Sequence, residues 1–116
     1  MRSAFRIHAD IEITKEEVVF LNSKRIELLR QIRLTGSILA ASKKIGLSYQ
    51  IAWTYIKEMN RLSPLPIVTQ QRGGSNGGGA QLTKYGLTII ETFLNMEDKH
   101  KDYLKEMENE IKSCFF

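Results

Sequence analysis

The feature that most constrains the fold of this chain is a tight turn, Gly46-Leu47-Ser48, between two short segments of helical pattern. Apolar side chains recur every three or four residues in SILAASKKI before the turn and in SYQIAWTYIKEMNRL after it. Two short helices joined by a three- or four-residue turn with a glycine are the outline of a helix-turn-helix. The small Ala41 lies where these helices would cross closely. The spacing therefore predicts a helix-turn-helix over residues 37–62.

The segments that precede this motif predict one strand and one further helix. AFRIHADIEI alternates apolar and polar side chains, which is the period of a half-buried strand. SKRIELLRQIRL has helical spacing, with Ser23 as its expected N-cap and Gly36 as its stop. The first 36 residues therefore predict a strand that leads into the first of three helices.

The helix after the turn has one wholly polar face. On a helical wheel a narrow arc contains two positive charges and no acid, and it consists of Gln50, Thr54, Lys57 and Arg61. Amide, hydroxyl, ammonium and guanidinium groups are those that bind base edges and phosphates in DNA. The face is either a DNA-contacting surface or the solvated side of an amphipathic helix.

The distribution of charge favours a polyanionic partner for one part of the chain. Residues 18–90 contain ten Lys and Arg against two Glu, a net charge of +8. Residues 91–116 contain four basic against seven acidic residues, a net charge of −3. This distribution indicates that a nucleic acid would bind the basic residues 18–90 and not the acidic residues 91–116.

Residues 72–79, RGGSNGGG, hold five glycines behind one arginine. A phosphate-binding P-loop requires a strand, then GxxxxGK[ST], then a helix. Here no lysine follows the glycines, and the strand-like runs IVTQQ and AQLT lie on either side. The stretch is therefore expected to be the tip of a β-hairpin. It is either a wing that contacts the DNA backbone or minor groove, or a turn without a ligand.

Three stretches together resemble a known family. GSI at residues 36–38, GLSYQIAWTYIKEMN at 46–60 and RGGSNGGGAQLTKYG at 72–86 are similar to the N-terminal DNA-binding domain of the bacterial molybdate-responsive regulators of the ModE family. The resemblance covers about residues 20–95. It implies a winged helix-turn-helix, LysR-like in kind, that binds a pseudo-palindromic operator as a dimer, at genes of molybdate transport or metabolism. Full-length members continue into molybdate-binding domains, which this chain is expected to lack, and molybdate binding is not expected.

These observations predict a winged helix-turn-helix domain over residues 1–86, with an N-terminal strand, and a long C-terminal dimerisation helix over residues 87–116. The predicted partners are double-stranded DNA and a second copy of the chain. The predicted DNA contacts are Lys43, Lys44, Ser48, Tyr49, Gln50, Thr54, Lys57, Arg61, Arg72, Gly74, Ser75, Asn76 and Lys84.

The helical pattern from Lys84 to about Lys112 contains a heptad-like seam, which indicates a partner helix. The seam, and so the predicted dimer interface, consists of Ile89, Phe93, Met96, His100, Tyr103 and Met107. The first half of the helix is also expected to pack on its own domain.

Other functions receive little support from the residues. Two histidines and a single cysteine, Cys114, make no metal set, and no cofactor fingerprint or nucleophile–base pair is present, so neither an enzyme nor a bound cofactor is expected. No apolar run reaches the ~18 residues of a membrane span, and a cytoplasmic protein is expected. The alternative function is a winged-helix module that binds a protein through its long helix and no longer binds DNA.

Overall fold

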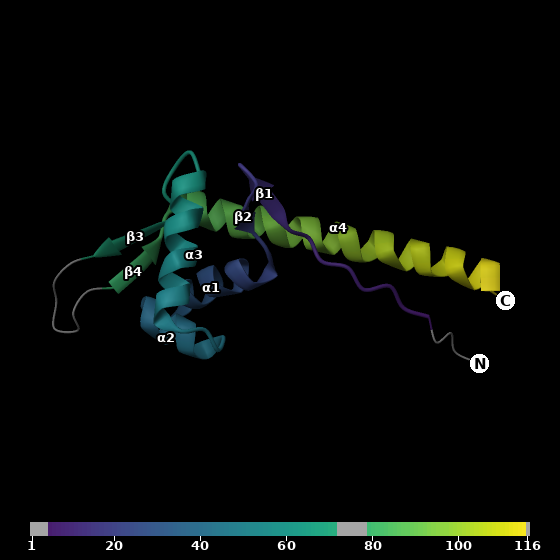
Figure 1. Ribbon diagram of the computed structural model, residues 1–116, viewed down its shortest axis with the longest axis horizontal. Helices are drawn as coiled ribbons and strands as arrows, with labels where there is room; N and C mark the ends of the chain where they lie inside the picture. The colour runs from purple at the N-terminus through teal and green to yellow at the C-terminus, as the bar shows by residue number, and fades with distance from the viewer. Residues whose placement is uncertain (1–4, 72–78, 116) are drawn as a thin grey trace.

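The structure is a computed structural model that describes residues 5–71 and 79–115 (Figure 1). In chain order the elements are β1 (Ile13–Lys15), β2 (Val18–Leu21), α1 (Ser23–Thr35), α2 (Ile38–Lys44), α3 (Tyr49–Leu62), β3 (Val68–Gln71), β4 (Gly79–Leu82) and α4 (Lys84–Phe115). Strand β1 pairs with β2 and strand β3 with β4, both antiparallel, in two separate two-stranded sheets. The predicted fold class, mainly α with a small antiparallel component and a long C-terminal helix, is confirmed.

Short polar residues set the ends of the helices. Gly36 ends α1 in the left-handed conformation, with φ at 68°, where a side chain would be strained. The hydroxyls of Ser37 and Ser48 cap α2 and α3 by accepting hydrogen bonds from backbone amides three residues later, each at 3.1 Å. The predicted cap of α1 was wrong by one residue, because the side chain of Asn22 accepts the amide of Arg25 at 2.9 Å.

The predicted N-terminal strand is a second correction. Residues 5–12 form no regular strand, and pairing begins only at Ile13. Alternation defines two faces but supplies no backbone partner, and a strand requires one. Instead this segment runs beside the far half of α4 (Figure 1), where the amide of Ile7 donates to a carboxylate oxygen of Glu108 at 2.8 Å. Backbone pairing occurs instead between β1 and β2, which form a short hairpin. Its turn residues Glu16 and Glu17 both have positive φ.

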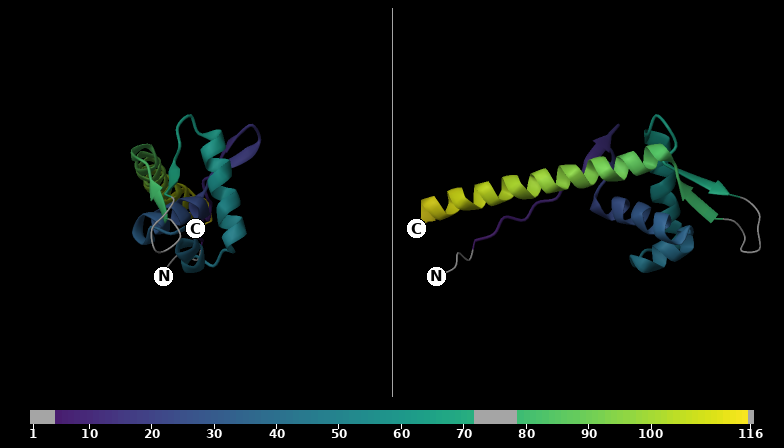
Figure 2. Two further views of the ribbon diagram at one scale, coloured as in Figure 1. Left: turned by 90° about the vertical axis from the view of Figure 1, so that its left-hand side faces the viewer. Right: turned by 180° about the vertical axis from the view of Figure 1, so that it is seen from behind.

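The core forms around the buried face of α1. Leu28, Leu29 and Ile32 are almost completely inaccessible, and α3 and α4 add side chains such as Met59 and Phe93. Removing apolar surface from water contributes about 25 cal/mol per Å², so this cluster is the main source of stability for the domain. In the left view of Figure 2, α3 and the start of α4 lie on opposite sides of the globular part. One face of α3 therefore remains on the outside.

Helix α4 extends well beyond the core. Its 32 residues span about 48 Å at ~1.5 Å per residue. The molecule measures 63 × 29 × 22 Å with a radius of gyration of 17.8 Å, against roughly 13 Å for a compact domain of similar length. The wing β3–β4 and the far end of α4 project in opposite directions from the globular part (Figure 1).

Candidate nucleic-acid interface

Helix α3 divides into a buried face and an exposed polar face, as its spacing predicts. Ala52, Ile56 and Met59 are buried in the core. The four residues of the opposite arc, which is here called the polar arc, are all exposed: Gln50, Thr54, Lys57 and Arg61. The helix therefore presents amide, hydroxyl and cationic groups together on the outer surface. Their binding to DNA stays a prediction.

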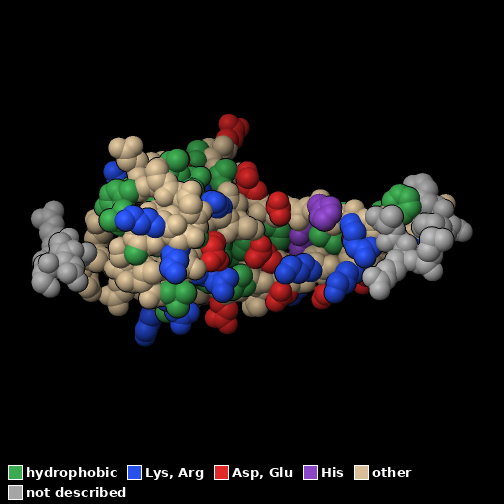
Figure 3. Space-filling view, turned by 90° about the horizontal axis from the view of Figure 1, so that it is seen from below, with side chains coloured by type: hydrophobic (Ala, Val, Ile, Leu, Met, Phe, Trp, Pro, Cys, Tyr) green, Lys and Arg blue, Asp and Glu red, His purple; other side chains and the backbone are tan. Residues whose placement is uncertain are grey.

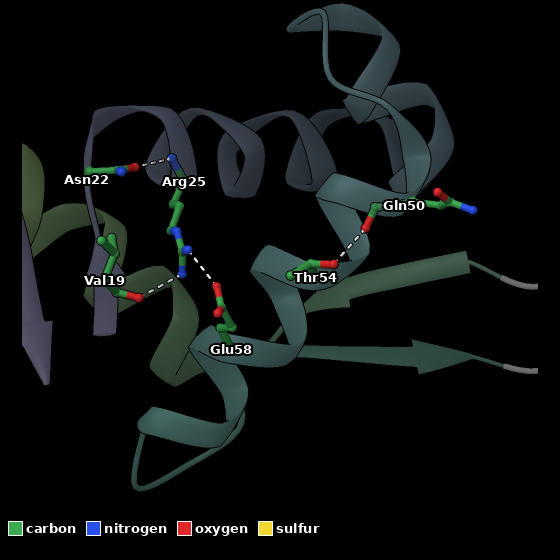
Figure 4. A network of polar contacts seen from close by, with 6 residues as sticks. All are labelled: Val19, Asn22, Arg25, Gln50, Thr54 and Glu58. Atoms are coloured by element: carbon green, nitrogen blue, oxygen red, sulfur yellow. Dashed lines mark hydrogen bonds and ion pairs between the residues drawn. The ribbon is translucent and has the colours of Figure 1, made fainter. Parts of the chain in front are cut away.

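The hydrogen bonds of the polar arc determine which donors and acceptors each side chain can still offer to a ligand. The hydroxyl of Thr54 donates to the carbonyl of Gln50 at 3.0 Å, so its proton is already used within the helix (Figure 4). The Gln50 side chain points away from the domain in the same view. Gln50 thus has both amide donors and its acceptor available, whereas Thr54 offers a methyl group and an acceptor.

The two cations of the polar arc each have a weak intramolecular partner. The Lys57 ammonium lies 5.6 Å from the centroid of the ring of Trp53, which is half-buried. Arg61 forms an ion pair of 3.3 Å with Glu16 at the turn of β1–β2, and both side chains are exposed. Exposed pairs of this kind contribute about 0–1 kcal/mol, so a phosphate can replace them.

An ion pair with one buried partner, Arg25, holds the inner flank of α3 (Figure 4). Arg25, which is 5% exposed, donates to Glu58 at 2.6 Å and to the carbonyl of Val19 at 2.9 Å. Its guanidinium also lies 4.4 Å from the centroid of the Tyr55 ring. One side chain thus joins α1, β2 and α3, and a buried charge needs this degree of pairing. This pair could not be predicted from the sequence, because its members are 33 residues apart and share no local pattern.

The wing is anchored at its base from two sides. The amide of Ala80 in β4 donates to the carbonyl of Gly36 between α1 and α2 at 3.0 Å. A Cβ on Gly79 would lie 2.9 Å from the same carbonyl, so only glycine permits this approach. On the other side, the amide of Thr83 donates to the carbonyl of Ile67 at 3.0 Å. A Cβ at Gly86 would overlap the Ile67 carbonyl oxygen, and these two glycines therefore fix where the wing lies.

The predicted tip of the wing, with Arg72, Gly74, Ser75 and Asn76, lies outside the described residues. The register of the strands that lead to it pairs Gln71 with Gly79. The exposed side chains of the described wing are uncharged, and they are Thr69, Gln70, Gln71 and Gln81. The described part of the wing therefore brings hydrogen-bonding amides, and no negative charge, to the side of α3.

The remaining predicted DNA contacts lie around α3 and the wing. Lys43 and Lys44 are exposed in the last turn of α2, and Lys84 is exposed at the start of α4. Ser48 caps α3, and Tyr49, 43% exposed, lies edge-on to Trp53 with ring centroids 6.3 Å apart. Seen from below, Lys and Arg side chains spread over the globular end, whereas Asp and Glu gather where α4 leaves it (Figure 3).

The predicted seam of α4 divides into two parts. Phe93, 1% exposed, belongs to the core of its own domain, so it is not available to a partner, and Ile89 packs against the same core. Met96 and Tyr103 are 37% and 61% exposed, while His100 and Met107 are half-buried. Two half-buried residues at heptad spacing, Leu104 and Ile111, were missed by the sequence analysis. The spacing of four, three and four residues could have predicted them, since it joins positions 100, 104, 107 and 111 into one stripe.

Other kinds of site are not found in the described part of the chain. No group of three or more His, Cys, Asp or Glu among residues 5–71 and 79–115 could hold a metal ion. Among the same residues no helix is long and apolar enough to cross a membrane.

Two short helices at a glycine turn, with a β-hairpin anchored beside the second, define a winged helix-turn-helix. The crystal structure of ArgP from Mycobacterium tuberculosis has the same fold over 74% of this chain and 30% of its own, with a TM-score of 0.52 and 15% identity. No family model matches the chain.

The sequence is similar to those of regulators named ModE. It is 38% identical over 112 residues to the molybdenum transport protein ModE of Azotobacter vinelandii, covering 94% of this chain and 42% of that protein. It is 44% identical over 78 residues to the DNA-binding transcriptional dual regulator ModE of Escherichia coli K12, covering 67% and 30%. The chain thus spans less than half the length of these relatives. Their names are those of a regulator and a transport protein, in agreement with the expectation that the chain is not an enzyme.

Proposed function

We propose that this chain is the DNA-binding part of a transcription regulator of the ModE type. The observation that carries the proposal is the polar arc, which is exposed and contains two cations and no acid. It lies on a helix that the Arg25–Glu58 ion pair holds beside a wing. The Escherichia coli relative is named as a DNA-binding regulator, which supports the same function. Helix α3 would enter the major groove, which admits one α-helix.

The proposed DNA contacts are of two kinds: some position the protein on the duplex, and others recognise the base sequence. Lys57 and Arg61 would bind phosphates, as would Lys43 and Lys44 at the end of α2, and these contacts bring no sequence preference. Gln50, with a free amide on the outer side of α3, would bind a base edge, with adenine as the expected partner. The wing would follow the backbone beside the groove.

The active unit would be a homodimer on a pseudo-palindromic operator. Two copies of α3 reach successive major grooves when they lie ~34 Å apart. The half-buried stripe of α4 beyond the core, with Leu104 and Ile111, would pack on its counterpart in the second copy. Sedimentation equilibrium should give a dimer at micromolar concentration, and Leu104→Asp should give a monomer. A monomeric unsubstituted chain would overturn the dimer.

The target genes would be those of molybdate transport or metabolism, in line with the name of the Azotobacter relative, a molybdenum transport protein. We do not expect the described residues to bind molybdate themselves. Calorimetry with molybdate and with tungstate should therefore give no heat of binding.

The salt dependence of binding tests the proposal. A labelled duplex, selected from a random library, is titrated with the chain and followed by fluorescence anisotropy. If four phosphates are neutralised, affinity should fall by about a hundredfold between ~50 and ~200 mM salt. A chain that binds no duplex at ~50 mM salt would be a protein-interaction module instead.

A further inference from the structure

One side chain links α3 directly to the wing. Asn60 lies in the last turn of α3, one turn after Lys57 on the side that faces β3. Its carbonyl oxygen accepts the amides of Ile67 at 2.8 Å and Val68 at 3.2 Å. Its amide nitrogen donates to the carbonyl of Val68 at 2.9 Å. Three hydrogen bonds from one side chain fix both the position and the direction of the strand's first residues.

The connection between α3 and β3 offers little other support. Residues 63–67 contain two prolines, Pro64 and Pro66, which have no amide to donate. Within the described residues, every hydrogen bond between α3 and β3 passes through Asn60. Ile67 is fully buried, so water cannot replace the acceptor that its amide would lose. Asn60 is therefore the link that sets the angle of β3 to α3.

The opposite strand of the wing is held independently. Strand β4 is bonded through Ala80 to Gly36 at the start of the helix-turn-helix. With Asn60 intact, both strands of the wing are tied to the motif that carries the polar arc. Without Asn60, β3 keeps its pairing to β4 but loses its polar tie to α3. The wing can then change its angle to the polar arc within the limits that the buried side chains of Ile67 and Val68 allow.

We propose that Asn60 is a positioning residue for DNA binding. It fixes the angle between α3 and the wing so that the two contact one duplex together, without touching the DNA itself. This inference rests on the proposed function, and it adds a residue that neither the polar arc nor the wing includes. It implies that Asn60 contributes affinity only through the wing.

A double-mutant cycle tests this implication. The four proteins are the unsubstituted chain, Asn60→Ala, a chain whose residues 72–78 are replaced by Asn-Gly, and the combination of both changes. Affinity for the selected duplex is measured at one salt concentration. Asn60→Ala should weaken binding about tenfold when the wing is complete and less than about twofold when it is shortened. A residue that acts only on stability would weaken binding by the same factor whether the wing is complete or shortened.

Two further variants keep the test decisive. Ile26→Val removes one methylene from the buried start of α1, ten residues before the wing contact at Gly36, and it should lower thermal stability without changing affinity. If Asn60→Ala fails to fold, Asn60→Asp replaces it in the cycle. Its carboxylate still accepts both amides but cannot donate to the Val68 carbonyl, and any effect of its charge that is independent of the wing cancels in the cycle.

The outcomes separate this inference from the function on which it rests. Equal losses in both backgrounds, or no loss with the complete wing, would overturn the role of Asn60 and leave DNA binding standing. A shortened wing that binds as tightly as the complete one would also overturn it. Failure of the unsubstituted chain to bind any duplex would overturn the proposed function, and this inference with it.

Discussion

Two antiparallel hairpins flank α3, and they differ in almost every property that matters to a polyanion. The hairpin β1–β2 carries Glu16 and Glu17 at its turn, and Lys15 donates to the carbonyl of Leu62 at the end of α3 at 2.9 Å. The hairpin β3–β4 exposes only uncharged side chains in its described part. Both are fixed to the same helix, but only β3–β4 presents a surface that suits phosphates. The acidic hairpin therefore marks the edge of the proposed footprint, and the wing extends it.

The largest effect is expected where the acidic hairpin joins α3. Arg25→Ala removes the bond to Glu58, the bond to Val19 and the contact with Tyr55. Because it breaks a largely buried ion pair, it should lower the free energy of unfolding by about 3 kcal/mol. Urea denaturation followed by circular dichroism measures this change. A loss below about 1 kcal/mol would show that β2 and α3 are held mainly by apolar packing.

Shortening the wing should have the next largest effect. Since Gln71 pairs with Gly79, an Asn-Gly turn in place of residues 72–78 keeps the register of β3–β4. The affinity for the selected duplex should fall about tenfold, which corresponds to ~1.4 kcal/mol, while the melting temperature is unchanged. Unchanged affinity would mean that the glycines only close the hairpin.

Within the polar arc, two substitutions should give different kinds of loss. Lys57→Ala should weaken binding to all sequences alike and reduce the slope of log affinity against log salt by about 1. Gln50→Ala should relax the preference at a single base position by ~1 kcal/mol. Anisotropy titrations on a set of single-base variants separate the two patterns. If both substitutions give uniform losses, the assignment of Gln50 to a base edge is wrong.

The smallest effect, and one of opposite sign, is expected at the acidic turn. Glu16 and Glu17 have φ of 54° and 63°, a conformation that Asn-Gly adopts more readily. Replacing both residues by Asn-Gly should raise the free energy of unfolding by about 1 kcal/mol. It should also tighten DNA binding about twofold, since two negative charges next to the footprint are lost. Weaker binding would place this hairpin inside the footprint.

The same turn introduced into the two hairpins is thus expected to act in opposite directions. This contrast follows from charge and position and could not be predicted from the sequence. Residues 5–13 alternate as a strand does, but alternation does not reveal whether a partner strand is within reach. The paired strands begin only at Ile13, after a segment that lies along α4.

The helices were predictable because their signals are local. Gly36, Ser37 and Ser48 end or begin helices through contacts within three or four residues, and the polar arc follows from the helical period alone. The links that orient α3 join residues far apart in the chain or on different elements, as with Arg25 and Glu58. Periodicity likewise placed Phe93 in the seam of α4 without showing that its own domain buries it.

A map of amide chemical-shift changes on addition of the selected duplex tests the central claim most directly. The largest changes are expected on the exposed side of residues 48–61 and in the wing strands, at residues 69–71 and 81. Residues 15–18 of the acidic hairpin and the far half of α4 should change little. Changes centred on those two regions, with α3 unaffected, would contradict the account.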